Sequence, residues 1–137
     1  MPRETFQPPE LFDSKKWGFS QIVGSPPGRT VHISGQVAWD ASESVLADDL
    51  ETQFRKALEH VFIAVRAAGG EPDDLQFFRF YIPNFRPGED AETIARVLVD
   101  VFGTENPPGS SWSGVQALAQ PEFLIEVEAT AIIPDPA

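Results

Sequence analysis

Apolar residues between positions 48 and 68 recur at the spacing of an amphipathic helix. They are Leu50, Phe54, Ala57, Leu58, Val61, Phe62, Val65 and Ala68, which share one face at 3.6 residues per turn. Asp48 with Glu51 three residues later is typical of a capping box. Gly69 and Gly70, followed by Pro72, are typical of a helix end. The pattern therefore predicts a helix that buries one side along its whole length.

A second, shorter helix is predicted between Asp90 and Gly103. Its apolar positions, again at helical spacing, are Ile94, Val97, Leu98, Val101 and Phe102. Between the two helices, residues 75–82 are rich in aromatic side chains and end at Pro83. This segment predicts a strand that is buried on at least one face.

Four further strands are predicted on either side of this core. Residues 19–23 and 30–34 read as a hairpin around a Gly- and Pro-rich turn, and residues 111–118 and 124–133 follow the second helix. The order ββαβαββ predicts an α+β two-layer sandwich, a mixed sheet with two helices on one face. We expect one domain over residues 1–137, in which the Pro-rich residues 1–16 form an extended arm.

The alternation within residues 124–133 assigns the two faces of the sheet. The odd positions from Ile125 to Ile133 are all apolar and face the predicted helices, whereas Glu126 and Glu128 face the other way. The same counting places His32, Ser34 and Trp112 on the helix-free face. Because two helices cannot cover both faces, we expect a second chain or a ligand to cover this one.

Each polar residue on these strands has a structural and a functional interpretation. Paired glutamates on an exposed strand often only protect the sheet from aggregation, but two nearby carboxylates can also raise the pKa of one of them. The sequence Ser34, Gly35, Gln36 is typical of a backbone approach to a ligand and equally of a bulge. Arg79, inside a predicted strand, needs a partner such as Glu126, Glu128 or a ligand carboxylate, and an internal ion pair is the interpretation that we favour.

Composition narrows the classes of function. The 137 residues include 21 acidic and 10 basic side chains, a net charge of −11 that disfavours nucleic acid as a partner. There is no cysteine, which excludes disulfides and thiolate ligands, and only two histidines, which leaves multi-histidine metal sites poorly supplied. The sequence has no apolar run long enough for a membrane span and no apolar signal core. We therefore expect a cytoplasmic protein without a metal site.

These segments resemble the RidA (YjgF, L-PSP) family over nearly the whole chain. The matching pieces are residues 18–21, 31–37, 53–70, 102–103 and 125–129. The resemblance implies a chorismate-mutase-like fold of the bacillus type. It also implies a homotrimer whose sheets form a central barrel, with three pockets between subunits.

The resemblance further implies hydrolysis of reactive enamines and imines to a keto acid and ammonia, without a metal or an organic cofactor. Glu126 matches the family glutamate that positions the hydrolytic water, and Ser34 with Gly35 matches a substrate-binding backbone segment. The family arginine that holds the substrate carboxylate, in a Pro-x-Arg-Ser motif, falls on Ser110. A pocket tyrosine falls on Phe19 and a helix asparagine on Ala95.

Three functions remain open at this point. The first is a divergent hydrolase or deaminase in which Glu126 is the general base, Ser110 and the Gly35 region position the ligand, and Phe19 with Trp112 form an apolar wall. The second is a non-catalytic trimer that binds a small metabolite or a partner, which the missing arginine favours. The third is the endoribonuclease activity that the family name carries, which the negative charge disfavours.

Overall fold

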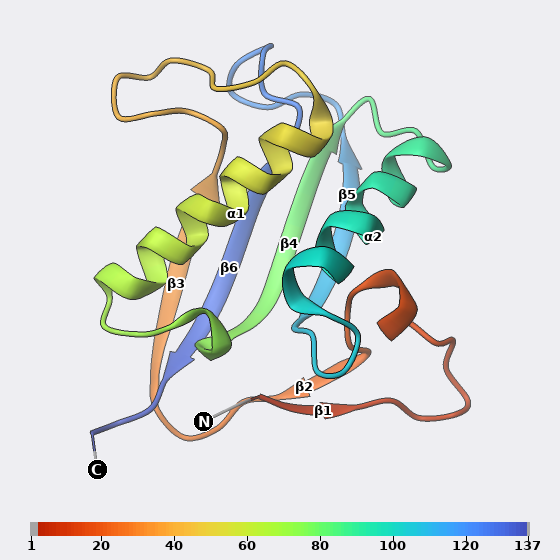
Figure 1. Cartoon of the computed structure of the whole chain (residues 1–137), viewed down its shortest axis with the longest axis vertical. Helices are drawn as coiled ribbons and strands as arrows, with labels where there is room; N and C mark the ends of the chain where they lie inside the picture. Colours follow the sequence, from red (N-terminus) through yellow and green to blue (C-terminus); the bar gives the residue numbers. More distant parts are fainter. Residues whose placement is uncertain (1–2, 137) are drawn as a thin grey trace.

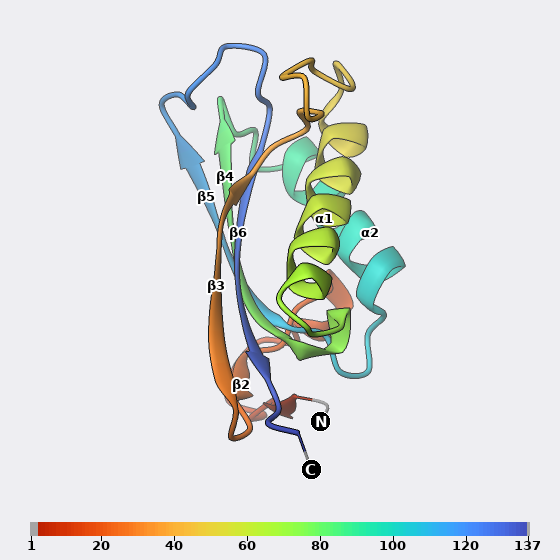
Figure 2. The same ribbon diagram turned by 90° about the vertical axis from the view of Figure 1, so that its left-hand side faces the viewer.

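The computed structural model describes residues 3–136, in which two helices cover one face of a four-stranded sheet (Figures 1 and 2). The sheet runs β3 (Arg29–Gln36), β6 (Glu126–Ile133), β4 (Leu75–Pro83) and β5 (Gly109–Val115) in spatial order. Only β4 and β5 are parallel. The predicted α+β sandwich with a mixed sheet is confirmed.

The first helix, α1 (Leu50–Ala67), begins one residue later than the sequence predicted. Asp49 is the N-cap, because its carboxylate accepts a hydrogen bond from the Thr52 amide at 2.9 Å. The expected capping box from Asp48 is therefore wrong. At the other end, Gly69 takes the left-handed conformation, with φ of +96°, and stops the helix as expected.

The core lies between the two helices and the sheet. The helix α2 (Glu89–Phe102) packs beside α1, and both bury their apolar stripes. The predicted alternation in β6 is confirmed, since its odd positions from Val127 to Ile133 are buried and Glu126 and Glu128 are half-buried on the other face. The largest fully buried side chains are Phe54, Phe78, Phe80, Leu58, Leu75, Ile82, Ile94 and Leu98.

The predicted hairpin near the N-terminus does not form. β2 (Ile22–Gly24) pairs with β1 (Glu4–Phe6) in a separate two-stranded sheet, and β3 pairs with β6 instead. Pro26 and Pro27 lie in the connection, and because they lack amide donors they cannot extend a ladder between β2 and β3. The strand β3 instead completes the edge of the main sheet.

Arg3 fixes the N-terminal segment to the domain. Its guanidinium is buried and donates to the carbonyl oxygens of Leu75 and Asn106, both at 2.7 Å. Burial lowers the pKa of Arg3, while the nearby Asp73 and Asp74 carboxylates raise it. The short helix η1 (Lys15–Trp17) follows and leads to Gly18, which packs directly against Leu98 of α2.

Two further boundaries differ from the predictions. β5 starts at Gly109 and ends at Val115, and β6 starts at Glu126 rather than at residue 124. A short helix, η2 (Pro72–Asp74), leads into β4. No helix within residues 3–136 is long and apolar enough to cross a membrane.

Candidate functional site

A pair of carboxylates marks the helix-free face of the sheet. Glu126 and Glu128 project from β6 on this face, and both are half-buried. In the neighbouring strand β4, Tyr81 pairs with Glu126 and Arg79 pairs with Glu128. The edge-on view shows that no helix lies over this side of the sheet (Figure 2).

Gly35 brings β3 into direct contact with Glu126. The register of β3 against β6 shifts between Ile33 and Gln36, so Ser34 and Gly35 form a bulge opposite a single residue of β6. A Cβ atom at position 35 would overlap the Glu126 carboxylate, so only glycine leaves this carboxylate where it lies. The structure therefore unites three of the predicted site residues, Ser34, Gly35 and Glu126.

The surroundings favour the protonated form of Glu126. Burial raises the pKa of its carboxyl group, and the negative charge of Glu128 raises this pKa further. The hydroxyl of Tyr81 donates a short hydrogen bond to the Glu128 carboxylate. This hydrogen bond and the partial burial of the hydroxyl raise the pKa of Tyr81, so the phenol stays protonated beside the acid pair.

Tyr81 was not predicted as part of this site. It belongs to the aromatic segment for which the sequence predicted a buried strand, but it lies two residues from Arg79 and therefore on the same, helix-free face. Phe78 and Phe80 are buried as expected. The expected ion pair of Arg79 is absent from residues 3–136, because its exposed guanidinium lies over the Phe77 ring, 5.2 Å from the centroid.

The remaining predicted residues lie on the other side of the sheet. Trp112 pairs with Phe80, whose side chain is buried under the helices, so Trp112 faces the helix side. The prediction that Trp112 shares a face with Glu126 is therefore wrong. Strand β5 is mostly serine and glycine, so it has no apolar alternation to assign its faces, and only its pairing with β4 decides which way Trp112 points.

These residues line an aromatic pocket, the β5 pocket, of about 480 Å³. It is lined by the aromatic residues Phe12, Trp17, Phe19 and Trp112 with Ala91, Ser110 and Ser111. The Phe19 ring meets Trp112 edge-on at 5.5 Å and Phe12 edge-on at 6.1 Å. The helix residue at the pocket is Ala91, whereas Ala95, the position expected from the resemblance, is buried in the core.

The two halves of the predicted site do not meet within one chain. Glu126 and Gly35 lie on the helix-free face at the β3 side of the sheet, and the β5 pocket lies at the opposite edge on the helix side. Ser110 and Trp112 thus cannot act on a ligand held by Glu126 of the same chain.

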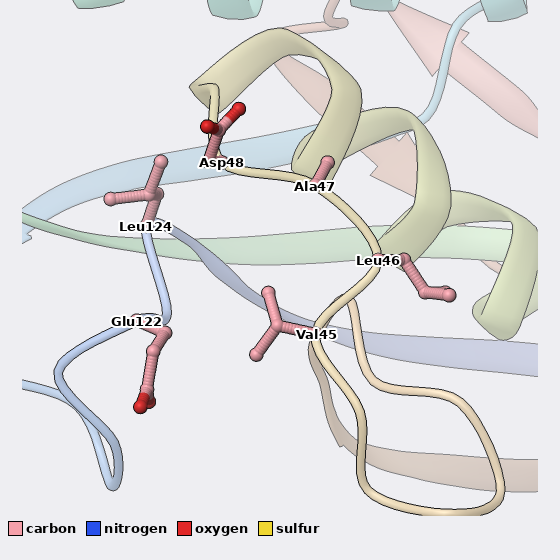
Figure 3. Close-up of a pocket in the computed structure, with 6 residues that line it drawn as sticks. All are labelled: Val45, Leu46, Ala47, Asp48, Glu122 and Leu124. Carbon is pink, nitrogen blue, oxygen red and sulfur yellow. The ribbon is translucent and has the colours of Figure 1, made fainter.

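A different pocket of about 610 Å³ lies at one end of the sheet (Figure 3). It is formed by the loop that precedes α1 and the loop that precedes β6, with Val45, Leu46, Leu124 and the acids Asp48 and Glu122 among its walls. None of the predicted site residues lines it. Within the described residues, no three His, Cys, Asp or Glu side chains gather where they could hold a metal ion.

The Glu126–Glu128 pair supports a prediction about ionisation. Replacing Glu128 with glutamine removes the second cause of the raised pKa of Glu126, so the carboxyl carbon of Glu126 is expected to titrate at lower pH than in the unchanged protein. Burial still raises this pKa, so the midpoint should not fall to that of an exposed glutamate. Carbon-detected NMR of the side-chain carboxyl groups measures the midpoint.

The matched control is Glu59→Gln, which removes an exposed carboxylate from α1 on the other side of the sheet. If the titration midpoint of Glu126 were the same in Glu128→Gln as in this control, the charge of Glu128 would not affect the pKa of Glu126, and the prediction would be wrong. Arg79 and Tyr81 on β4, and His32 on β3 opposite Thr130, are present in both variants.

Comparisons with known proteins agree with this fold. The sequence model of the endoribonuclease L-PSP family matches residues 15–133. A 2-iminobutanoate/2-iminopropanoate deaminase of Salmonella typhimurium is 28% identical over 112 residues, which are 81% of this chain and 85% of that protein.

Two solved structures are similar over nearly the whole chain. The Rid-family protein YyfB from Yersinia pestis, described as of unknown function, is 38% identical with a TM-score of 0.87, over 97% of this chain and all of that one. A YjgF/YER057c/UK114 family member from Mycobacterium tuberculosis is 26% identical with a TM-score of 0.66, over 96% and 99%. The chain therefore belongs to the endoribonuclease L-PSP family, also called the RidA/YjgF family.

Proposed function

We propose that this protein hydrolyses the C=N bond of a small imine or enamine at sites that two copies of the chain complete. The observation that carries the proposal is the division of the site. Glu126 with Gly35 occupies one face and edge of the sheet, and the aromatic β5 pocket occupies the other face and edge. A closed ring of copies, a homotrimer, would bring one half from each of two neighbours together.

The uncovered face supports such an assembly. Phe77, Tyr81 and Glu126 are half-buried there although no helix covers them. Aromatic side chains are enriched at interfaces, so two of them on a sheet face without a helix over it favour an interface over a free solvent surface. The relative from Salmonella typhimurium is named as an imine deaminase, which supports hydrolysis as the reaction.

Glu126 has the properties that this reaction needs. A water molecule attacks the imine carbon, its oxygen forms the new carbonyl group, and the C–N bond breaks to release ammonia. One group must take a proton from the water and return it to the departing nitrogen. A carboxylate whose pKa is raised by burial can do both, because it holds a proton more readily than an exposed glutamate does. These steps themselves need only water and a proton carrier.

The residues around the β5 pocket disfavour a 2-imino acid as the preferred substrate. Ser110 stands where the family arginine would bind the substrate carboxylate, and residues 97–137 contain neither lysine nor arginine. Loss of such a charge-assisted contact costs roughly 1.5–3 kcal/mol in binding. The same observation favours a second candidate, a trimer that binds a metabolite without turning it over. The charge of −11 weighs against an RNA substrate.

The decisive experiment mixes two variants that are each inactive. Glu126→Gln removes the proposed base, and Ser110→Trp fills the β5 pocket. With ammonia release from aliphatic and aromatic imines as the assay, neither variant alone should be active. Co-expressed in equal amounts, they should recover about a quarter of the unchanged activity, because random mixing completes that share of the sites.

Three results would contradict the proposal. One is the absence of turnover of any imine by the unchanged protein. Another is a light-scattering mass of one chain, 15.1 kDa. The third is a co-expressed mixture that stays as inactive as its components, while a mixture of the unchanged protein with Gln120→Trp, an exposed loop variant, remains active. If the unchanged protein forms a trimer but turns over none of the imines, the second candidate, a trimer that only binds a metabolite, is favoured.

A further inference from the structure

The β5 pocket is lined by aromatic side chains and, among the described residues, lacks the cation that a carboxylate-binding site usually has. Its polar lining residues are Ser110 and Ser111, and none of the residues lining the pocket within the described chain is charged. Ser111 pairs with Arg79 and so turns its side chain to the helix-free face, which leaves the Ser110 hydroxyl to face a ligand. A carboxylate moved from water into such surroundings would lose its hydration without gaining a cation. The volume of the β5 pocket, about 480 Å³, lies within the range of small-molecule sites.

The nearby lysines of η1 do not supply this cation. Lys15 donates to the carbonyl oxygen of Glu105 at 2.8 Å. Lys16 is exposed and lies over the ring of Trp17, 5.9 Å from its centroid. Neither is among the residues that line the pocket.

The Ser110 hydroxyl can donate one hydrogen bond to a ligand in the pocket. Its Oγ accepts the indole N–H of Trp112 at 2.9 Å. A hydroxyl that already accepts keeps its own hydrogen for a ligand. The matching ligand atom is therefore an acceptor such as a carbonyl oxygen, placed beside a flat apolar group that packs against the rings of Phe19 and Trp112.

From these walls we infer that the β5 pocket binds the uncharged aromatic part of its ligand, with a neutral carbonyl group at Ser110, and discriminates against carboxylates. The inference rests on the proposed function only in naming the substrate class for that site. The substrate class is then an aromatic imine or enamine that carries an amide, ester or ketone in place of the free acid.

A pair of probes that differ only in charge tests the inference. Phenylacetamide and phenylacetate have the same ring and nearly the same shape. At neutral pH the unchanged protein is expected to bind phenylacetamide at least tenfold more tightly, with shifts of the indole N–H signals of Trp17 and Trp112 in NMR titrations. Ser110→Ala should weaken the binding of phenylacetamide several-fold, because only the hydroxyl is lost.

Ser110→Arg should reverse the order of the two probes, since it places a cation in the pocket. Gln120→Arg adds the same charge to an exposed loop and should leave the order unchanged. Equal or tighter binding of phenylacetate by the unchanged protein overturns the inference, as does the absence of any Trp112 shift with phenylacetamide at its solubility limit. Because binding is measured without turnover, phenylacetamide binding by a protein that hydrolyses no imine would refute the proposed function alone.

Discussion

Replacing Glu126 with glutamine is expected to lower the turnover of an imine substrate by about 10²- to 10⁴-fold, the usual contribution of a general acid–base group. Glutamine keeps the size of the side chain, so we expect it to occupy the same space beside Gly35. It removes the group that takes a proton from water and returns it to the departing nitrogen. Ammonia release under saturating substrate measures the effect on kcat.

The pH dependence gives this prediction a second readout. The ionised form of Glu126 is the base, so the rate in the unchanged protein should rise with pH through the raised pKa of this group. In Glu128→Gln, which leaves the base in place, this rise should move to lower pH. A loss smaller than tenfold in Glu126→Gln, with a pH profile like that of the unchanged protein, would contradict the role of Glu126.

Replacing the buried polar side chain of Gln53 with an apolar one is expected to lower the free energy of unfolding strongly. Its side chain is fully buried in α1, where Nε2 donates to the carbonyl oxygens of Ala47 and Glu122 and Oε1 accepts the amide of Leu124, each at 2.9 Å. Gln53→Leu keeps the volume and leaves these three backbone groups without partners. We expect the free energy of unfolding to fall by about 3 kcal/mol.

Urea denaturation at one fixed protein concentration measures this change, because assembly would make stability depend on concentration. Gln120→Leu, at an exposed position, is the matched control and should change stability by less than about 0.5 kcal/mol. A cost below about 1 kcal/mol for Gln53→Leu would show that the two loops find other partners for these backbone groups. The same bonds hold the chain just before β6, so they also position Glu126.

Hydrophobic periodicity determined most of the layered fold. The stripe from Leu50 to Val65 could only be buried on one side, and the alternation in β6 could only turn Glu126 and Glu128 away from the helices. These patterns are local, so the sequence carries them without reference to the rest of the chain. The strand pattern alone did not bring Glu126 and Gly35 together. They could be predicted as one cluster because the family resemblance places both in the same site.

Pairing between distant segments decided the rest. β3 pairs with β6 rather than with β2, and the face of Trp112 follows from its pairing with Phe80. Neither fact is encoded in local spacing, because polar and glycine-rich strands can pair in either phase at similar cost. The sequence by itself thus determined the layers, the uncovered face and the acid pair. Only the tertiary structure decided that the predicted site is divided between two edges of the sheet, since that depends on strand order, which is a non-local property.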